Sequence, residues 1–142
     1  MCGPVDKGGT PDYNTDLGRT LRPPVKEFPV GVFNGLFPVL DGKEDAARSF
    51  AKEAGGQRRD QLGAHLVRSN VTRETWSLLA TPMGSFINVW FEGDVEAAFA
   101  DLATNNDEFG VWMRERILDV TGVDMSQPND STPPETLLDW KA

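Results

Sequence analysis

Large apolar side chains alternate with smaller or polar ones along residues 74–92. The alternation runs on both sides of a Pro-Met-Gly break at residues 82–84. A period of two residues, with aromatic and β-branched side chains around such a break, is typical of a β-hairpin. Both faces of the second half carry large side chains. We therefore expect one face to pack against helices and the other to line an enclosed space.

Two more stretches predict the elements before this hairpin. Residues 30–40 are apolar on both faces and indicate a central strand, in which Gly31 and Gly35 let a helix approach closely. A helix should follow from Asp41, whose carboxylate would cap it, with Glu44 completing a capping-box-like pair. Gly55 and Gly56 should weaken or kink that helix before a second helical stretch at residues 57–69.

After the hairpin, the spacing of apolar residues becomes helical. Asp94 should cap a short helix, residues 105–107 should interrupt it, and Gly122 should end the helix that continues beyond them. Residues 124–134 have the composition of a loop, and residues 136–140 predict a short strand at a sheet edge. The resulting order predicts an α+β, ferredoxin-like βαββαβ fold, with a four-stranded antiparallel sheet and helices on one face.

The composition narrows the class of protein. Of the 142 residues, 1–25 are rich in Gly, Pro, Asp and Thr and predict a flexible N-terminal arm, while 26–142 predict one domain. The arm could instead lie on a partner subunit through Tyr13, Leu17 and Leu21. The net charge of −8 opposes binding to nucleic acid or to anionic membranes. With no run of ~18 apolar residues and no secretory leader, we expect a cytoplasmic protein.

Three segments of the chain resemble a known family. They are TPMG before a strand that ends in FEGD, the run WMRERILDVTGVD, and the terminal LLDW. Over about residues 30–140 the chain resembles the small DUF6176 proteins, which are similar to the dimeric α/β-barrel superfamily of ferredoxin-like proteins. The resemblance implies two four-stranded sheets facing each other across a dimer axis. Members of that superfamily include cofactor-free oxygenases, cyclases, haem enzymes, decarboxylases and binding proteins, so the fold alone does not select a function.

The residues themselves also favour a homodimer. One face of the sheet should carry Val32, Leu36, Phe86 and Trp90, which form a patch too apolar to be left in water. Contact between two copies of this face covers both patches at once. We therefore expect a homodimer through the open sheet face.

Candidate ligand-binding residues lie in the same strands. Asn34 and Asn88 share a face with bulky apolar neighbours, and a buried amide without partners costs roughly 1–3 kcal/mol. They either bond to each other, to backbone or to water, or they orient a small organic molecule together with Trp90, Phe86 and the hairpin residue Trp76. The tryptophans could also serve only as core or interface residues.

His65 is the only histidine in the chain and the one natural proton shuttle near neutral pH. It could act in acid–base catalysis, lie satisfied in the structure, or ligate a haem iron as histidines do in the resembled superfamily. The chain lacks a nucleotide-phosphate loop and any closely spaced zinc ligands, so we expect no cofactor and no metal.

These observations lead to one expected function and two alternatives. The expected function is binding of a small organic molecule by a dimeric α/β barrel, with or without cofactor-free cyclase, isomerase or oxygenase activity on an aromatic or polyketide-like metabolite. The first alternative is a non-catalytic structural or regulatory dimerisation module. The second is a haem-binding protein.

Overall fold

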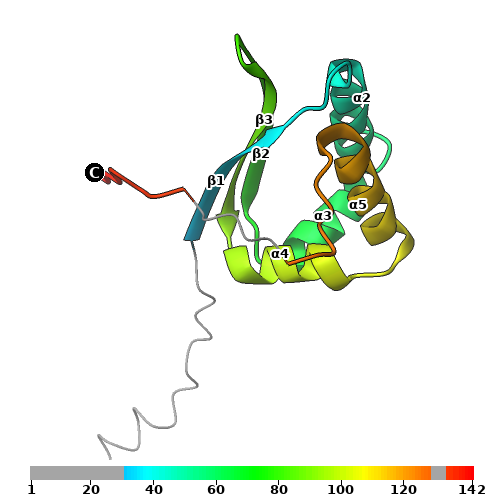
Figure 1. Cartoon of the computed structure of the whole chain (residues 1–142). Coiled ribbons are helices and arrows are strands. Elements are labelled where there is room, and N and C mark those ends of the chain that lie inside the picture. Colours follow the sequence, from blue (N-terminus) through cyan, green and yellow to red (C-terminus); the bar gives the residue numbers. More distant parts are fainter. Residues whose placement is uncertain (1–30, 129–133) are drawn as a thin grey trace, which may run out of the picture.

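The computed structural model describes residues 31–128 and 134–142, so the predicted N-terminal arm lies outside the described residues. The elements in chain order are β1 (Gly31–Pro38), α2 (Glu44–Gly55), α3 (Arg59–Arg68), β2 (Arg73–Thr81), β3 (Gly84–Gly93), α4 (Val95–Thr104) and α5 (Glu108–Thr121). The three strands form one antiparallel sheet in the order β1-β3-β2. The helices of the described chain cover one face of this sheet and leave its other face open (Figure 1).

The central strand β3 determines which side chains lie on each face. It pairs with β1 from Gly31↔Gly93 to Pro38↔Phe86 and with β2 from Arg73↔Glu92 to Thr81↔Gly84. Because side chains alternate along each strand, one set points toward the helices and the other toward the open side. We call these the inner and the outer face.

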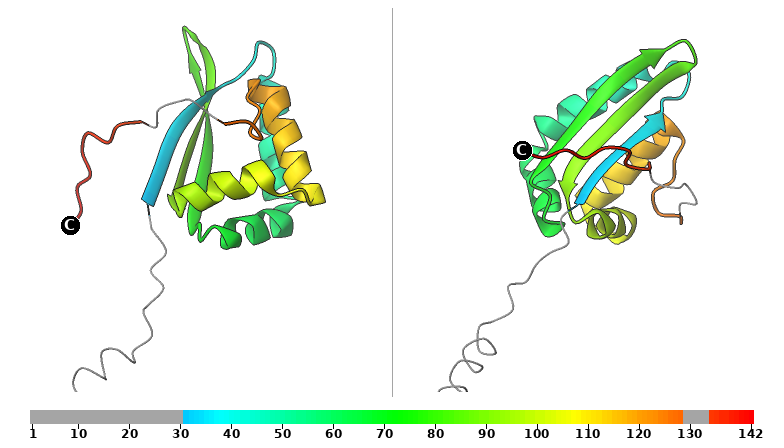
Figure 2. Two further views of the ribbon diagram at one scale, coloured as in Figure 1. Left: turned by 60° about the horizontal axis from the view of Figure 1, so that its bottom comes forward. Right: turned by 90° about the vertical axis from the view of Figure 1, so that its left-hand side faces the viewer.

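Two apolar clusters hold the helices against the inner face. Val39, Ala47 and Val120 form one cluster, in which α2 meets the end of α5. The other consists of Phe50, Phe109 and Met113. A separate aromatic group joins β1, β3 and α4, where the Phe33 ring lies 5.4 Å from Phe91 and 4.9 Å from Phe99. Figure 2 shows the resulting two layers, with the sheet on one side and the helices on the other.

The helix boundaries confirm most of the predicted signals. Asp94 accepts a hydrogen bond from the Ala97 amide at 3.0 Å and caps α4, and Gly122 ends α5 in the left-handed conformation with φ 75°. The break after Gly55 and the interruption at residues 105–107 are also present. The predicted Asp41 cap is wrong. The residue before α2 is Lys43, whose side chain makes no capping bond.

The predicted ferredoxin-like fold with a four-stranded sheet is wrong. The described chain has a three-stranded sheet and four helices, and residues 134–142 contain no strand. Leu137, Leu138 and Trp140 of this segment are 77–87% exposed. The physical reason lies in the segment itself. Leu137 and Leu138 are adjacent and so cannot share one strand face, and Pro134 lies two residues before the predicted strand at residues 136–140. The described residues therefore do not form the expected four-stranded half of a barrel either.

Two helical glycines provide a matched test of the packing between α4 and α5. A Cβ at Gly110 would collide with the backbone carbonyl of Asn105, whereas a Cβ at Gly63 in α3 meets only open space. We expect Gly110→Ala to lower the free energy of unfolding by about 1–3 kcal/mol. Gly63→Ala should raise it by about 1 kcal/mol, the usual gain in helix propensity. Urea denaturation of both variants measures these changes, and a stabilised Gly110→Ala protein would contradict the described approach of the two segments.

Candidate functional site

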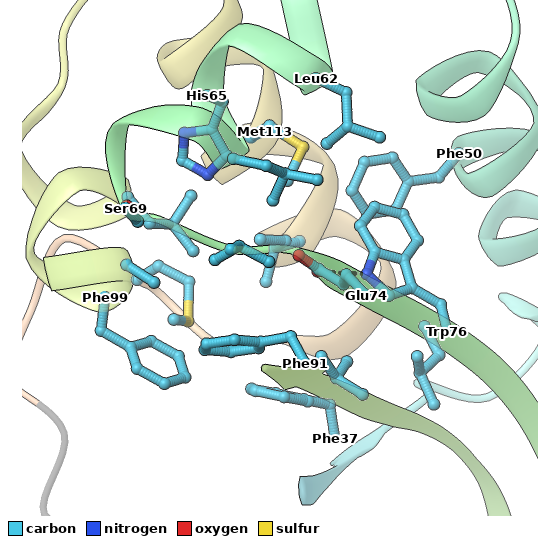
Figure 3. Close-up of a pocket in the computed structure, with 18 of the residues that line it drawn as sticks. Phe37, Phe50, Leu62, His65, Ser69, Glu74, Trp76, Phe91, Phe99 and Met113 are labelled. Carbon is cyan, nitrogen blue, oxygen red and sulfur yellow. Dashed lines mark hydrogen bonds between the residues drawn. The ribbon is translucent and has the colours of Figure 1, made fainter. Parts of the chain in front are cut away.

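A cavity of about 90 Å³ lies between the inner face of the sheet and the helices. Its walls are mostly apolar and include several aromatic side chains from both layers (Figure 3). The aromatic wall residues are Phe37, Phe50, Trp76, Phe91 and Phe99. An apolar cavity with a few polar groups is the usual form of a small-molecule site.

Glu74 brings a carboxyl group to this apolar wall. Its position in β2 places it on the inner face with Trp76, and the Trp76 Nε1–H donates a hydrogen bond to Glu74 Oε1 at 2.6 Å (Figure 3). Burial raises the pKa of Glu74, while the hydrogen bond from Trp76 opposes part of that rise. No described Lys or Arg side chain forms an ion pair with Glu74, so its surroundings favour the neutral acid.

Ser69 supplies a second polar group, at the end of α3. Its backbone is satisfied, since its amide donates to the carbonyl of Leu66 and its carbonyl accepts from the Asp94 amide at 3.0 Å. The hydroxyl is buried and has no hydrogen-bond partner among the described residues. Ser69 is only 2% exposed and lines the cavity. A buried hydroxyl without a partner costs free energy, which a bound ligand or water can recover.

His65 lines the same cavity and is held by α4. Its Nδ1 lies 2.7 Å from Asp101 Oδ2, and Arg68 binds the same carboxylate through two nitrogens at 3.1 and 3.2 Å. Burial lowers the pKa of His65 and outweighs the opposing attraction of Asp101. Neutral His65 therefore donates its Nδ1–H to Asp101. The resulting contribution to stability is present above the ordinary pKa of 6.5 and is lost as the pH falls below it.

The sheet separates the predicted ligand-binding residues into two groups. Trp76 lies at the cavity together with His65. Asn34, Asn88, Trp90 and Phe86 lie on the outer face instead, where Asn34 pairs with Trp90 across the strands. The amide of Asn34 is exposed and that of Asn88 half-buried, so water can satisfy both.

Sequence reasoning missed the two most informative polar groups. Glu74 has the same strand parity as Trp76, and that parity could have placed it on the cavity side. Ser69 follows His65 by four residues, the spacing that brings two side chains onto one helix face. What no local pattern shows is that the Ser69 hydroxyl lacks a partner, because this depends on the packing of α3 against the sheet.

A wider hollow of about 680 Å³ lies along β1, α4 and the segment after α5. The polar side chains in its wall are Asp124 and Gln127, which are exposed, and Asp124 already accepts hydrogen bonds from Ser126. The described residues thus give its wall no buried polar group that requires a ligand. The smaller cavity is the better candidate site.

Comparisons of the chain with protein-family models, with curated proteins and with solved structures found no match. The resemblance to the DUF6176 proteins therefore stays a prediction. Within residues 31–128 and 134–142, no helix is long and apolar enough to cross a membrane. In the same residues no group of three His, Cys, Asp or Glu side chains could hold a metal ion.

Replacing Glu74 by Gln tests whether the folded protein keeps this carboxyl neutral. The raised pKa means that the native state holds the proton more tightly than the unfolded state. The free energy of unfolding therefore falls as the pH rises from the ordinary value of 4.5 through the raised pKa. Gln does not titrate and can still accept from Trp76. We expect the melting temperature of Glu74→Gln relative to the native chain to increase from about pH 4 to about pH 8, measured by thermal unfolding. A pH-independent difference would contradict the described burial.

Proposed function

We propose that this chain binds a small, largely apolar organic molecule in the cavity between the inner sheet face and the helices. The observation that supports this most is the Ser69 hydroxyl, which is buried against the cavity and has no partner among the described residues. A ligand with one polar group would satisfy it while the aromatic wall buries the apolar remainder.

The size of the cavity favours a compact ligand. A dry cavity of about 150 Å³ binds benzene, and the space here is about 90 Å³. Met113 and Met125 form part of the wall, and their flexible, polarizable side chains can shift to admit a single ring. A single-ring aromatic metabolite fits this space better than a multi-ring polyketide.

A cofactor-free enzyme of the cyclase, isomerase or oxygenase type is the second candidate function. It is favoured by two titratable side chains, Glu74 and His65, that line one apolar cavity. Burial raises the pKa of the acid and lowers the pKa of the imidazole, so the cavity favours the neutral form of both groups. General acid–base catalysis uses groups tuned in this way.

The cavity volume argues against the haem alternative. Cavities that hold ligands of drug size occupy about 300–1,000 Å³, and a haem needs a pocket of at least that order. The space beside His65 is only about 90 Å³. We therefore do not propose haem binding. The non-catalytic dimerisation module stays an alternative and predicts a cavity that holds no organic ligand.

We also propose a homodimer through the outer face of the sheet. Val32 and Leu36 of β1 are each 57% exposed there, and Leu79 of β2 is 45% exposed. The register places Leu79 beside Phe86, and Phe86 beside Pro38, so an apolar band crosses all three strands. A second copy of the same face would remove this band from water.

Native mass spectrometry of the purified chain tests the ligand proposal. We expect a co-purified organic mass on the native chain. Ala98→Leu, which adds bulk to the cavity wall, should remove most of that mass, while Ala100→Leu on the exposed side of the same helix should keep it. A native chain that carries no organic mass, and binds none from a metabolite extract, would favour the non-catalytic module.

The dimer proposal has its own matched pair of variants. Leu36→Lys introduces a charge on the outer face, whereas Val67→Lys changes an exposed apolar residue of α3 that is 76% exposed. We expect light scattering after gel filtration to give the native chain and Val67→Lys twice the 15.6 kDa chain mass. The Leu36→Lys protein should dissociate at least about tenfold more readily, because a buried unpaired charge costs more than 1.4 kcal/mol. A measured mass of 15.6 kDa for the native protein, that of one chain, would contradict the proposal.

A further inference from the structure

We propose that the cavity selects uncharged carbonyl compounds, because the protonated carboxyl group of Glu74 donates a hydrogen bond to the carbonyl oxygen of the ligand. This inference rests on the proposed ligand-binding function and specifies its chemical class. It depends on the arrangement of Glu74 and Trp76, and on the absence of Lys and Arg side chains from the described residues of the cavity wall.

The hydrogen bond from Trp76 determines where the proton of Glu74 lies. An indole N–H can only donate, so Glu74 Oε1, at 2.6 Å from Nε1, must act as an acceptor. The carbonyl oxygen of a neutral acid is a stronger acceptor than its hydroxyl oxygen, so this bond favours the proton on Oε2. Trp76 is itself held in place by Phe50, whose ring centre lies 5.0 Å away. The carboxyl group thus lies at the cavity wall and is held there by Trp76 (Figure 3).

The charges around the cavity disfavour an anionic ligand. Among the described residues no Lys or Arg lines it, and His65 is the only other titratable side chain that they contribute to its wall. His65 is engaged by Asp101, and the charge of Asp101 is balanced by Arg68. A carboxylate ligand would therefore lose its hydration and lie beside Glu74 without a compensating cation from the described residues. A neutral carbonyl group avoids that cost and accepts the proton of Glu74.

The surroundings of Glu74 favour the neutral form of this donor. Burial raises the pKa of Glu74 above its ordinary value of 4.5, in keeping with its apolar surroundings. The Ser69 hydroxyl, from the end of α3, provides a second group that can bond to the same ligand. A compact ketone or similar molecule therefore has one donor in β2 and one rotatable hydroxyl in α3.

Three probes of similar shape test this class on the full chain: cyclohexanone, methylenecyclohexane and cyclohexanecarboxylate. The first two differ only in C=O against C=CH₂. We expect cyclohexanone to bind about tenfold more tightly than methylenecyclohexane, the value of one satisfied hydrogen bond of about 1.4 kcal/mol. The carboxylate should not compete. Isothermal titration calorimetry, or ligand-detected NMR for weak binding, measures these affinities.

Variants of Glu74 show whether the acid is responsible. Glu74→Gln keeps both an acceptor for Trp76 and an N–H donor, so its preference for the ketone should stay within about threefold of the native value, or roughly 0.7 kcal/mol. Glu74→Leu should remove the preference. The native preference should also fall as the pH rises and Glu74 ionises, while that of Glu74→Gln should not. This comparison separates Glu74 from His65, which is present in both proteins, and it does not depend on the Leu variant folding.

Equal affinities for cyclohexanone and methylenecyclohexane would overturn the carbonyl inference, and so would tight binding of the carboxylate. Failure of cyclohexanone to bind would also overturn it. The co-purified organic mass tests the proposed function independently of these probes. If that mass is present but the ketone preference is absent, only the inference fails. If neither an adduct nor any probe binds, both proposals fail.

Discussion

The pairing of β3 on both of its edges is the constraint on which the arrangement of the protein depends. With β1 on one side and β2 on the other, its side chains can lie only above or below the sheet. The helices cover one of these faces and not the other (Figure 1). A shift of β3 by one residue would exchange Phe91 for Trp90 on the inner face and move every candidate site residue of β3 to the opposite side of the sheet.

The sequence predicted this alternation well because it is a local property. The hairpin, the strand of β1 and the caps at Asp94 and Gly122 depend on residues within one or two turns of each other. The expected fourth strand failed because pairing depends on a distant partner. Residues 136–140 have strand-forming side chains but no alternating pattern that would fix them against β1. The α+β class was thus predictable, and the number of strands was not.

The candidate site was predicted only in part, for a related reason. Strand parity placed Asn34 and Asn88 on one common face, which is where they lie. The inference that both amides are buried and need a partner was wrong, because that face is open and Asn34 is exposed to water. His65 and Trp76 were selected by residue type and do line the cavity. Glu74 has the same parity as Trp76, but its burial depends on how the helices pack over β2.

Burying the polar groups of the cavity costs the folded state free energy, by an amount that depends on the pH. Neutral His65 favours the folded state at high pH and neutral Glu74 favours it at low pH, while the unpartnered Ser69 hydroxyl is unfavourable at any pH. The apolar clusters around Val120 and Phe109 must offset these costs. A ligand that bonds to Ser69 and Glu74 would recover part of this free energy. Binding should therefore stabilise the folded chain most at a pH where Glu74 is neutral. The same polar groups that weaken the empty protein would thereby provide its selectivity.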